Sequence, residues 1–294
     1  MINQLLTGTI FNQQYEGKKF VKLTNQWENH NGYLFVSGLN IDSIPFNPHG
    51  QCQPGGIYFC QLEDLHLWLN YRDQEMFYVR FVTIPDDALV WTAKKKFKAD
   101  HLILGERLEI GDLEVWKDPA YCLTAVKYDG FSLRHIKQQT PQICLEAIKN
   151  NGLALKYVFE QTQAICLAAV RWNASSLKYV TKQTSHICLE AVKNNGHALK
   201  YVLEQTPKIC LAAVRQNGWA LGDVIHRTSE ICLAAVQNQG RALKYVTQQT
   251  PQICLAAVEN DGCALEYVLE QSPQICLVAV KNNQNARRYV KVPF

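Results

Sequence analysis

Hydrophobic positions recur with a fixed step along the second part of the chain. The stretch of residues 143–162 returns, with small changes, from Ile165, Ile187, Ile209, Ile231, Ile253 and Ile275. A weaker copy begins at Tyr121, and each step is 22 residues. A strict period of this length indicates stacked structural units, none of which buries its apolar face alone.

Each unit carries the signals of two short helices. In residues 140–162, Thr140 can cap a helix and Pro141 suits its first turn. Three apolar residues share one face of that helix, Cys144, Ala147 and Ile148. Gly152 is expected to end it, because glycine tolerates a positive φ angle. A second helix follows with Leu155 on its apolar side, so we expect two helices of roughly 8–10 residues per repeat, held by packing between repeats.

A leucine-rich repeat has a similar period and is an alternative interpretation. Its core needs Leu-x-Leu before an Asn, but Arg215 stands where the second Leu should be in residues 211–217. Ala-rich windows and a Pro at the helix start also favour helices. The sequence therefore predicts an all-α solenoid of eight 22-residue two-helix repeats over residues 119–294. In its last repeat Arg287 replaces an apolar Leu, as expected of a polar cap.

Residues 1–118 do not repeat and carry the signals of a small α+β domain. Alternating or β-branched runs predict strands at residues 20–24, 56–60, 77–84, 88–92 and 99–104. Turn residues separate these runs, as at 54–56 and 85–87. Leucines at helical spacing predict one helix in residues 62–70.

The net charge of +4 is divided unevenly along the chain. Residues 1–120 contain 11 Lys and Arg against 15 Asp and Glu. Residues 121–294 contain 19 against 11, a net charge of +8. A basic array can attract an anionic partner, although a charged surface can also be simply solvated.

Eight of the 11 cysteines occupy one repeat position. Packed helices lie about 8–10 Å apart, too far for a disulfide between neighbouring repeats. These cysteines are therefore predicted to be buried free thiols, as in a reducing compartment. The N-terminus lacks the pattern of a secretory signal, and no stretch of about 18 apolar residues is present. We therefore expect no membrane partner and a cytoplasmic or other intracellular location.

Few residues of the first part suggest chemistry. Tyr58 on one strand and Glu106 near the end of another faintly resemble ADP-ribosyltransferase-like folds, which place an aromatic residue and a glutamate around a nicotinamide. Those folds also need a His or Arg on the first strand, where this chain has Lys22 and Thr24. Four potential metal ligands fit no zinc spacing, namely His30, His49, Cys52 and Cys60. We expect no catalytic residue, metal or cofactor, and keep the ADP-ribosyltransferase-like domain as a further alternative.

Several runs in the first part resemble one known module. They are residues 22–32, with Asn-Gln-Trp-Glu-Asn at their centre, residues 52–59 (Cys-Gln-Pro-Gly-Gly-Ile-Tyr-Phe) and residues 98–105 (Lys-Ala-Asp-His-Leu-Ile-Leu-Gly). They resemble the N-terminal module of giant-DNA-virus repeat proteins, which precedes ankyrin or other repeats. The array resembles short Ile-Cys-Leu-x-Ala-Val repeats of unassigned function from giant viruses and some intracellular bacteria. The resemblance implies a viral, repeat-bearing adaptor, which would act in a host cell.

Two features of the array are candidates for binding. One is a row of lysines, each followed by a tyrosine: Lys156, Lys178, Lys200 and Lys244. Regularly spaced basic and aromatic groups could follow a nucleic acid, but such lysines also belong on a solvated helix face. The other feature is a set of departures from the repeat. Trp172 occupies a site that is typically Asn or Gln, and the most variable position holds His197, Trp219 and Arg241.

The two tryptophans are the preferred anchors of an interface. A buried aromatic anchor contributes more to binding than an exposed charge pair. We therefore predict a non-enzymatic repeat adaptor that binds a protein partner, in a viral–host interaction, through Trp172 and Trp219. Nucleic-acid binding by the lysine row is the alternative hypothesis.

Overall fold

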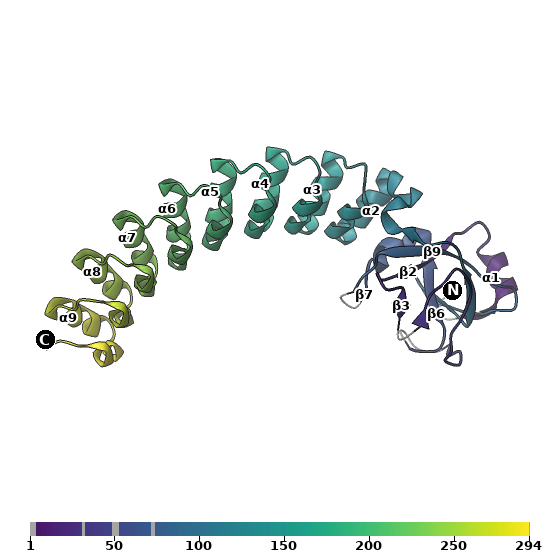
Figure 1. The fold of residues 1–294 in the computed structure, drawn as a ribbon, viewed down its shortest axis with the longest axis horizontal. Helices are drawn as coiled ribbons and strands as arrows, with labels where there is room; N and C mark the ends of the chain where they lie inside the picture. Colours follow the sequence, from purple (N-terminus) through teal and green to yellow (C-terminus); the bar gives the residue numbers. More distant parts are fainter. Residues whose placement is uncertain (1–3, 31–32, 49–52, 72–73, 294) are drawn as a thin grey trace. The chain divides into compact units, whose positions relative to one another are not determined.

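The structure is a computed structural model of the 294-residue chain. It describes residues 4–30, 33–48, 53–71 and 74–293. The chain divides into two compact units, residues 1–150 and 151–294, and each is described by itself. The first unit contains the strands and the first two α-helices of the array, and the second contains the later repeats (Figure 1). The expected domain boundary after residue 118 stays a prediction.

An antiparallel sheet of nine strands forms the centre of the described part of the first unit. Eight strands lie in the order β1-β10-β11-β6-β2-β9-β12-β5, and β13 pairs with β9. Their bounds are β1 (Gln4–Thr7), β2 (Phe20–Thr24), β5 (Gly38–Ile41), β6 (Ile57–Gln61), β9 (Tyr78–Thr83), β10 (Leu89–Thr92), β11 (Phe97–Ala99), β12 (His101–Leu104) and β13 (Leu108–Glu109). Strands from the beginning and the end of this region lie next to one another, so the order of strands in the sheet cannot be read from their order in the sequence.

Shorter elements surround this sheet. Two hairpins pair β3 (Asn29–His30) with β4 (Tyr33–Leu34) and β7 (Asn70–Tyr71) with β8 (Gln74–Glu75). One α-helix, α1 (Gly8–Gln14), follows β1, and three 3₁₀ helices are η1 (Leu62–Trp68), η2 (Ile110–Asp112) and η3 (Glu114–Lys117). An α+β first part, as predicted, is confirmed.

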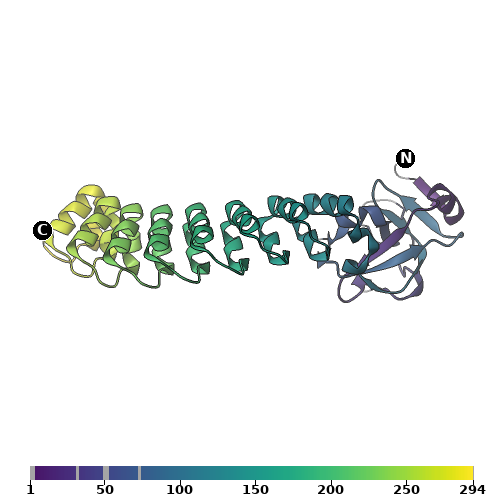
Figure 2. The ribbon, with the colours of Figure 1, turned by 90° about the horizontal axis from the view of Figure 1, so that it is seen from above.

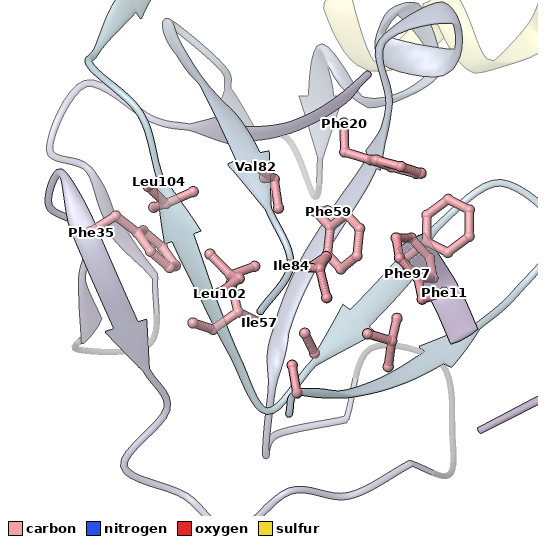
Figure 3. Packing of buried hydrophobic residues seen from close by; sticks show 13 residues of the cluster. Phe11, Phe20, Phe35, Ile57, Phe59, Val82, Ile84, Phe97, Leu102 and Leu104 are labelled. Atoms are coloured by element: carbon pink, nitrogen blue, oxygen red, sulfur yellow. The ribbon is translucent and has the colours of Figure 1, made fainter. Parts of the chain in front are cut away.

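Phenylalanines from distant parts of the sequence meet in the core of the first unit (Figure 3). The rings of Phe11, Phe20, Phe59 and Phe97 have centroids 5.0–6.0 Å apart, mostly in edge-to-face or tilted arrangements. Such arrangements suit the quadrupoles of aromatic rings. Phe11 comes from α1, a helix that the pattern did not predict because it is only seven residues long.

Most strand predictions for the first unit are confirmed. The expected strand over residues 99–104 is wrong as one element, because β11 ends at Ala99 and β12 begins at His101. Between them the Asp100 carboxylate accepts hydrogen bonds from the backbone N–H of Leu89 (2.9 Å) and of His101 (2.7 Å). The chain therefore turns at Asp100, and β11 and β12 pair with different strands. The helix expected in residues 62–70 is present as the 3₁₀ helix η1.

The described residues of the array form eight α-helices of ten residues each. They are α2 (Pro119–Tyr128), α3 (Pro141–Asn150), α4 (Gln163–Trp172), α5 (Ser185–Asn194), α6 (Pro207–Gln216), α7 (Ser229–Asn238), α8 (Pro251–Asn260) and α9 (Pro273–Asn282). A 3₁₀ helix of six residues follows each one: η4 (Gly130–His135), η5 (Gly152–Tyr157), η6 (Ala174–Tyr179), η7 (Gly196–Tyr201), η8 (Gly218–Asp223), η9 (Gly240–Tyr245), η10 (Gly262–Tyr267) and η11 (Gln284–Tyr289). In the second unit the helix pairs stand side by side in one row (Figure 2).

The helical reading of the repeat is confirmed, and the leucine-rich alternative is wrong. The expected length of the second helix, roughly 8–10 residues, is also wrong, because it is a tighter 3₁₀ helix of six residues. The helix starts follow the predicted chemistry. The Thr206 hydroxyl, for example, accepts a hydrogen bond from the N–H of Ile209 at 3.4 Å, as a helix N-cap does.

Glycine occupies the turn for a reason that the sequence did not suggest. Gly152 does not adopt a positive φ angle, so that expectation is wrong. A Cβ atom added to Gly152 would lie 2.9 Å from the carbonyl oxygen of Ala169 in the next repeat, and one added to Gly196 would lie 2.5 Å from that of Ala213. Glycine therefore allows close approach between repeats. In the last described repeat, the exposed residue Gln284 occupies this position.

Glutamine side chains join neighbouring repeats. The Gln161 amide donates to the carbonyl oxygen of Tyr179 (2.9 Å) and accepts from the N–H of Thr181 (3.0 Å), both in the next repeat. Its oxygen also lies 3.8 Å from the thiol of Cys166, which donates to it. The same bonds recur at Gln183.

The repeat cysteines are buried and free, as predicted for these described residues. Burial raises the pKa of thiols such as Cys188 and Cys210. A thiol with a raised pKa stays protonated at neutral pH and is a poor nucleophile. The repeat cysteines are therefore packing residues, and six of them donate a weak S–H hydrogen bond to a glutamine.

Candidate protein-binding surface

The lysine row of the array lies on aromatic rings. The ammonium nitrogens of Lys156, Lys178, Lys200 and Lys244 lie 4.4–4.9 Å from the ring centroid of the tyrosine that follows each of them. The four lysines are exposed and the tyrosines are half-buried. A cation at this distance from a ring is attracted to its face. These contacts give the lysine row a structural role within each repeat.

Three of the sequence-predicted residues contact the following repeat. Trp219 is half-buried, with its ring edge-on to Tyr245 at 6.3 Å and the Lys244 ammonium 4.7 Å from its centroid. Arg241 forms an ion pair with Asp261 (Nε to Oδ2, 2.7 Å). His197 lies 3.4 Å from the Asp223 carboxylate. Variable residues at this position therefore take part in packing between repeats.

Trp172 is the sequence-predicted anchor that stands apart from such packing. Its side chain lies at the C-terminal end of α4 and is 63% exposed. In most other repeats this position holds an amide that bonds to the backbone of a neighbouring repeat. Asn238, for example, accepts from the N–H of Gly218 (2.8 Å) and donates to the carbonyl of Arg215 (2.9 Å). An indole has one donor and no acceptor, so Trp172 cannot accept from the corresponding N–H of Gly152.

A row of exposed apolar residues was missed from the sequence. It lies on the loops that follow the 3₁₀ helices, one residue per repeat, and we name it the loop row. Its members are Phe159, Leu203, Ile225 and Leu269, which are 64–75% exposed. The same position holds Thr181 and Thr247 in the other two repeats between them. The signal was the placing of these residues 22 or 44 positions apart. A buried valine stands before each of them, such as Val158, and extends the apolar run, so the pattern was overlooked.

The loop row is held in place by the glutamine bonds between repeats. The N–H groups of Leu203, Ile225 and Leu269 donate to the side-chain oxygens of glutamines in the preceding repeat, over 2.9–3.0 Å. The loops therefore present large apolar side chains from a fixed backbone. An ordered binding surface loses less conformational entropy when a partner binds.

The residues considered for an ADP-ribosyltransferase-like site in the first unit are Tyr58, Lys22, Thr24 and Glu106. The Tyr58 hydroxyl donates to the Gln53 carbonyl at 3.2 Å and accepts from the N–H of Gln53 at 3.1 Å. Lys22 and Thr24 are buried on β2, and burial lowers the pKa of Lys22 to about 8. Glu106 is exposed.

The potential metal ligands lie partly beyond the described residues. His49, Cys52 and the side chain of His30 are outside them. Burial raises the pKa of Cys60 to about 12, so its thiol stays protonated and is a poor ligand. Within the described ranges, no three His, Cys, Asp or Glu residues are grouped to hold a metal ion.

Comparison with known proteins connects the chain with giant viruses. The family model described as "Domain of unknown function (DUF4116)" matches residues 118–163, 185–226 and 228–271. The uncharacterized protein R869 of Acanthamoeba polyphaga mimivirus is 34% identical over 107 residues, which cover 36% of this chain and 78% of R869. The chain belongs to the same family of giant-virus proteins as R869. The resemblance found in the sequence is thereby confirmed.

Two further relatives are named after ankyrin repeats, which are repeats of another kind. The putative ankyrin repeat proteins R868 and R229 of the same virus are 27% and 33% identical over 119 and 103 residues. These matches cover 38% and 32% of this chain but only 57% and 32% of R868 and R229. No solved structure matches the chain. In the described ranges, each helix is too short or too polar to cross a membrane.

Proposed function

We propose that the protein is a non-enzymatic adaptor whose repeat array binds a protein partner inside the infected host cell. The observation that carries this proposal is the loop row, in which large apolar side chains at one repeat position, 22 or 44 residues apart, are 64–75% exposed. Isolated exposed apolar residues need no explanation, but a repeated set marks a surface for association. Relatives named as putative ankyrin repeat proteins agree with an interaction role.

The loop row suits a protein partner better than a nucleic acid. Its residues are aliphatic apart from Phe159, so they offer little stacking for successive bases. Trp172 is the one sequence-predicted anchor that remains exposed to a partner, whereas Trp219 packs against the next repeat.

The experiment replaces the loop row by the residue that the chain itself uses at this position. The full chain with Phe159, Leu203, Ile225 and Leu269 all changed to Thr serves as bait in a lysate of Acanthamoeba, beside the unchanged chain. A Thr181→Ser/Thr247→Ser variant is the matched control, because it alters the same loops without removing large apolar groups. Half of each lysate is treated with nuclease.

We expect the unchanged chain and the control to retain a protein, and the four-Thr variant to lose it. Nuclease treatment should change nothing. Equal capture by all three chains would exclude the loop row as the binding surface. Capture that nuclease abolishes would favour the nucleic-acid hypothesis instead.

A further inference from the structure

A tryptophan at position 172 is expected to lower the stability of the array. The amide found there in other repeats makes a bond that indole cannot replace, as Asn260 does by accepting from the N–H of Gly240 at 2.7 Å. Trp172 also exposes 63% of a large aromatic side chain to water. Packing within the array therefore gives no reason for a tryptophan at this site. An exposed Trp that replaces a structural amide points to an interaction, because Trp is enriched among binding hot spots.

Cations extend from Trp172 along the helices that follow it. Arg171, Lys193 and Arg215 occupy equivalent exposed positions near the C-terminal ends of α4, α5 and α6. Arg171 pairs with Glu190 at 2.8 Å, which lowers the pKa of that carboxyl. Neither Lys193 nor Arg215 has a carboxylate within ion-pair distance in the described part of the chain. The row then ends, because α7 and α8 carry Gln237 and Glu259 there.

The equivalent positions lie next to one another across the repeats. The Asn194 amide of α5 donates to the carbonyl of Arg171 at the end of α4 (2.8 Å). This bond fixes the C-terminal end of α5, and with it the neighbouring Lys193, beside the end of α4. Helices in contact are about 8–10 Å apart, so Trp172, Lys193 and Arg215 span roughly two such steps. We name these three residues the Trp172 surface.

We propose that the Trp172 surface binds an acidic polypeptide segment, with one apolar side chain against the indole and carboxylates against Lys193 and Arg215. The charges are complementary, because the surface offers two cations without ion-pair partners and the second unit has a net charge of +6 from 15 Lys and Arg against 9 Asp and Glu. An extended chain advances about 3.3 Å per residue, so carboxylates three and six residues from the apolar one match the helix spacing.

The geometry favours a peptide over a nucleic acid. A bound strand would need several stacking platforms and a continuous basic groove. Here one indole is followed by Lys193 and Arg215, neither of which lies within ion-pair distance of a carboxylate of the described residues. Glu190 interrupts the row, because it pairs with Arg171 and its pKa is lowered by Arg171 and by the nearby Lys193, and Glu259 stands beyond Arg215. The inference rests on the proposed function only in that the ligand is a polypeptide, since it uses none of the loop-row residues.

The test is a titration of the full chain with a fluorescently labelled synthetic peptide. Its sequence is Glu-Ser-Ser-Glu-Ser-Ser-Phe-Ser-Ser-Glu-Ser-Ser-Glu, which has the same spacing in both chain directions. Two control peptides replace every Glu by Gln, or the Phe by Ser. Binding is measured by anisotropy at low and at high salt.

The protein variants use residues that the array already tolerates. Trp172→Asn restores the usual amide, so a loss of binding cannot come from unfolding. Lys193→Gln/Arg215→Gln introduces the residue found at position 237, and Lys281→Gln is the matched control on α9. We expect Trp172→Asn to weaken binding about 30-fold. The Gln pair should weaken it about fivefold at low salt, an effect lost at about 1 M salt, and Lys281→Gln should have none.

Several results would overturn the proposal. They are equal binding of the Glu and Gln peptides, no detectable binding of the Glu peptide, and a Trp172→Asn variant that binds normally. Displacement of the peptide by a short poly-dT oligonucleotide at equal concentration would assign the surface to nucleic acid. Because the loop row remains intact in every variant, these failures leave the capture experiment unaffected, and the two hypotheses fail separately.

Discussion

The repeat array and the sheet of the first unit satisfy their buried polar groups in different ways. The array uses neutral amides and hydroxyls, each repeated every 22 residues, such as Gln161 and Thr206. The first unit uses charges that occur once. Arg80 is bound by both oxygens of Glu28, at 2.9 and 3.3 Å, and Lys98 donates to three backbone carbonyls.

Because of this difference, residues that support the fold can be told apart from candidate binding residues more easily in the array than in the first unit. In the array the same position can be compared across several repeats. A residue that differs there without a packing reason, such as Trp172, is therefore a candidate for binding. In the first unit every buried charge is unique. Glu28 even adopts a positive φ angle of 49°, yet its ion pair with Arg80 already accounts for its place. The comparison predicts large effects from single changes in the sheet and smaller ones in the array.

The largest effect is expected from Glu28→Ala. Arg80 is only 6% exposed, and removing its partner leaves a buried charge without a counter-ion. We expect a loss of about 3–5 kcal/mol in the free energy of unfolding, measured by urea denaturation. Glu114→Ala breaks the exposed pair with Lys117 and should cost about 0–1 kcal/mol. Similar losses in both variants would show that the buried pair has no special weight.

A smaller effect is expected from Gly196→Val in the array. The new Cβ would lie 2.5 Å from the carbonyl oxygen of Ala213, so the repeats must separate. We expect a loss of about 1–3 kcal/mol, seen as a lower thermal midpoint. Gln284→Val changes the same repeat position in the last described repeat, where the side chain is exposed, and should have little effect. If both variants lose the same stability, close approach between repeats is not the role of the glycine.

Acid should weaken the first unit through His135. Burial and the neighbouring Arg134 lower the pKa of His135 from 6.5 to about 3. Arg134 donates to its Nε2 at 2.9 Å, which needs a neutral ring. The unfolded chain binds this proton below pH 6.5 and the folded chain does not. The free energy of unfolding is therefore highest above pH 6.5 as far as His135 is concerned, and it decreases as the pH falls from 6.5 towards 3.

The size of this effect follows from the shift in pKa. Between pH 7.5 and pH 5.5 the His135 contribution should fall by about 1 kcal/mol. The measurement compares urea unfolding of the unchanged chain with that of His135→Gln at both pH values. The change in stability with pH should be smaller in the variant. An identical change in both chains would mean that folding does not lower the pKa of His135.

The smallest effect, and the only gain, is expected from Trp172→Asn. The restored amide can accept from the N–H of Gly152, and a hydrogen bond of this kind contributes about 0.5–1.5 kcal/mol. The thermal midpoint should rise slightly or stay the same. Asn238→Trp is the reverse change in α7 and should lower it, because it removes bonds to Gly218 and Arg215. A clear loss of stability in Trp172→Asn would show that the tryptophan supports the fold.

Features that depend on neighbouring residues could be predicted from the sequence. The 22-residue period, the Thr caps and the alternating run of β9 were all predicted, because capping and periodicity act over a few residues. The burial of the cysteines followed from their place on one helical face. Trp172 was found as a departure from the repeat, and its role as an anchor stays a prediction.

Features that depend on contacts between distant residues became known from the folded chain alone. The strand order, the place of Phe11 in the core and the break at Asp100 come from pairing across the first unit. The turn glycine is explained by the next repeat, and Trp219 is half-buried because Tyr245 lies beside it. The loop row was found only from the exposed fractions of the side chains, because each valine is buried and the apolar residue after it is exposed. A linear pattern records that a residue is apolar, whereas the packing of the other repeats decides whether water reaches it.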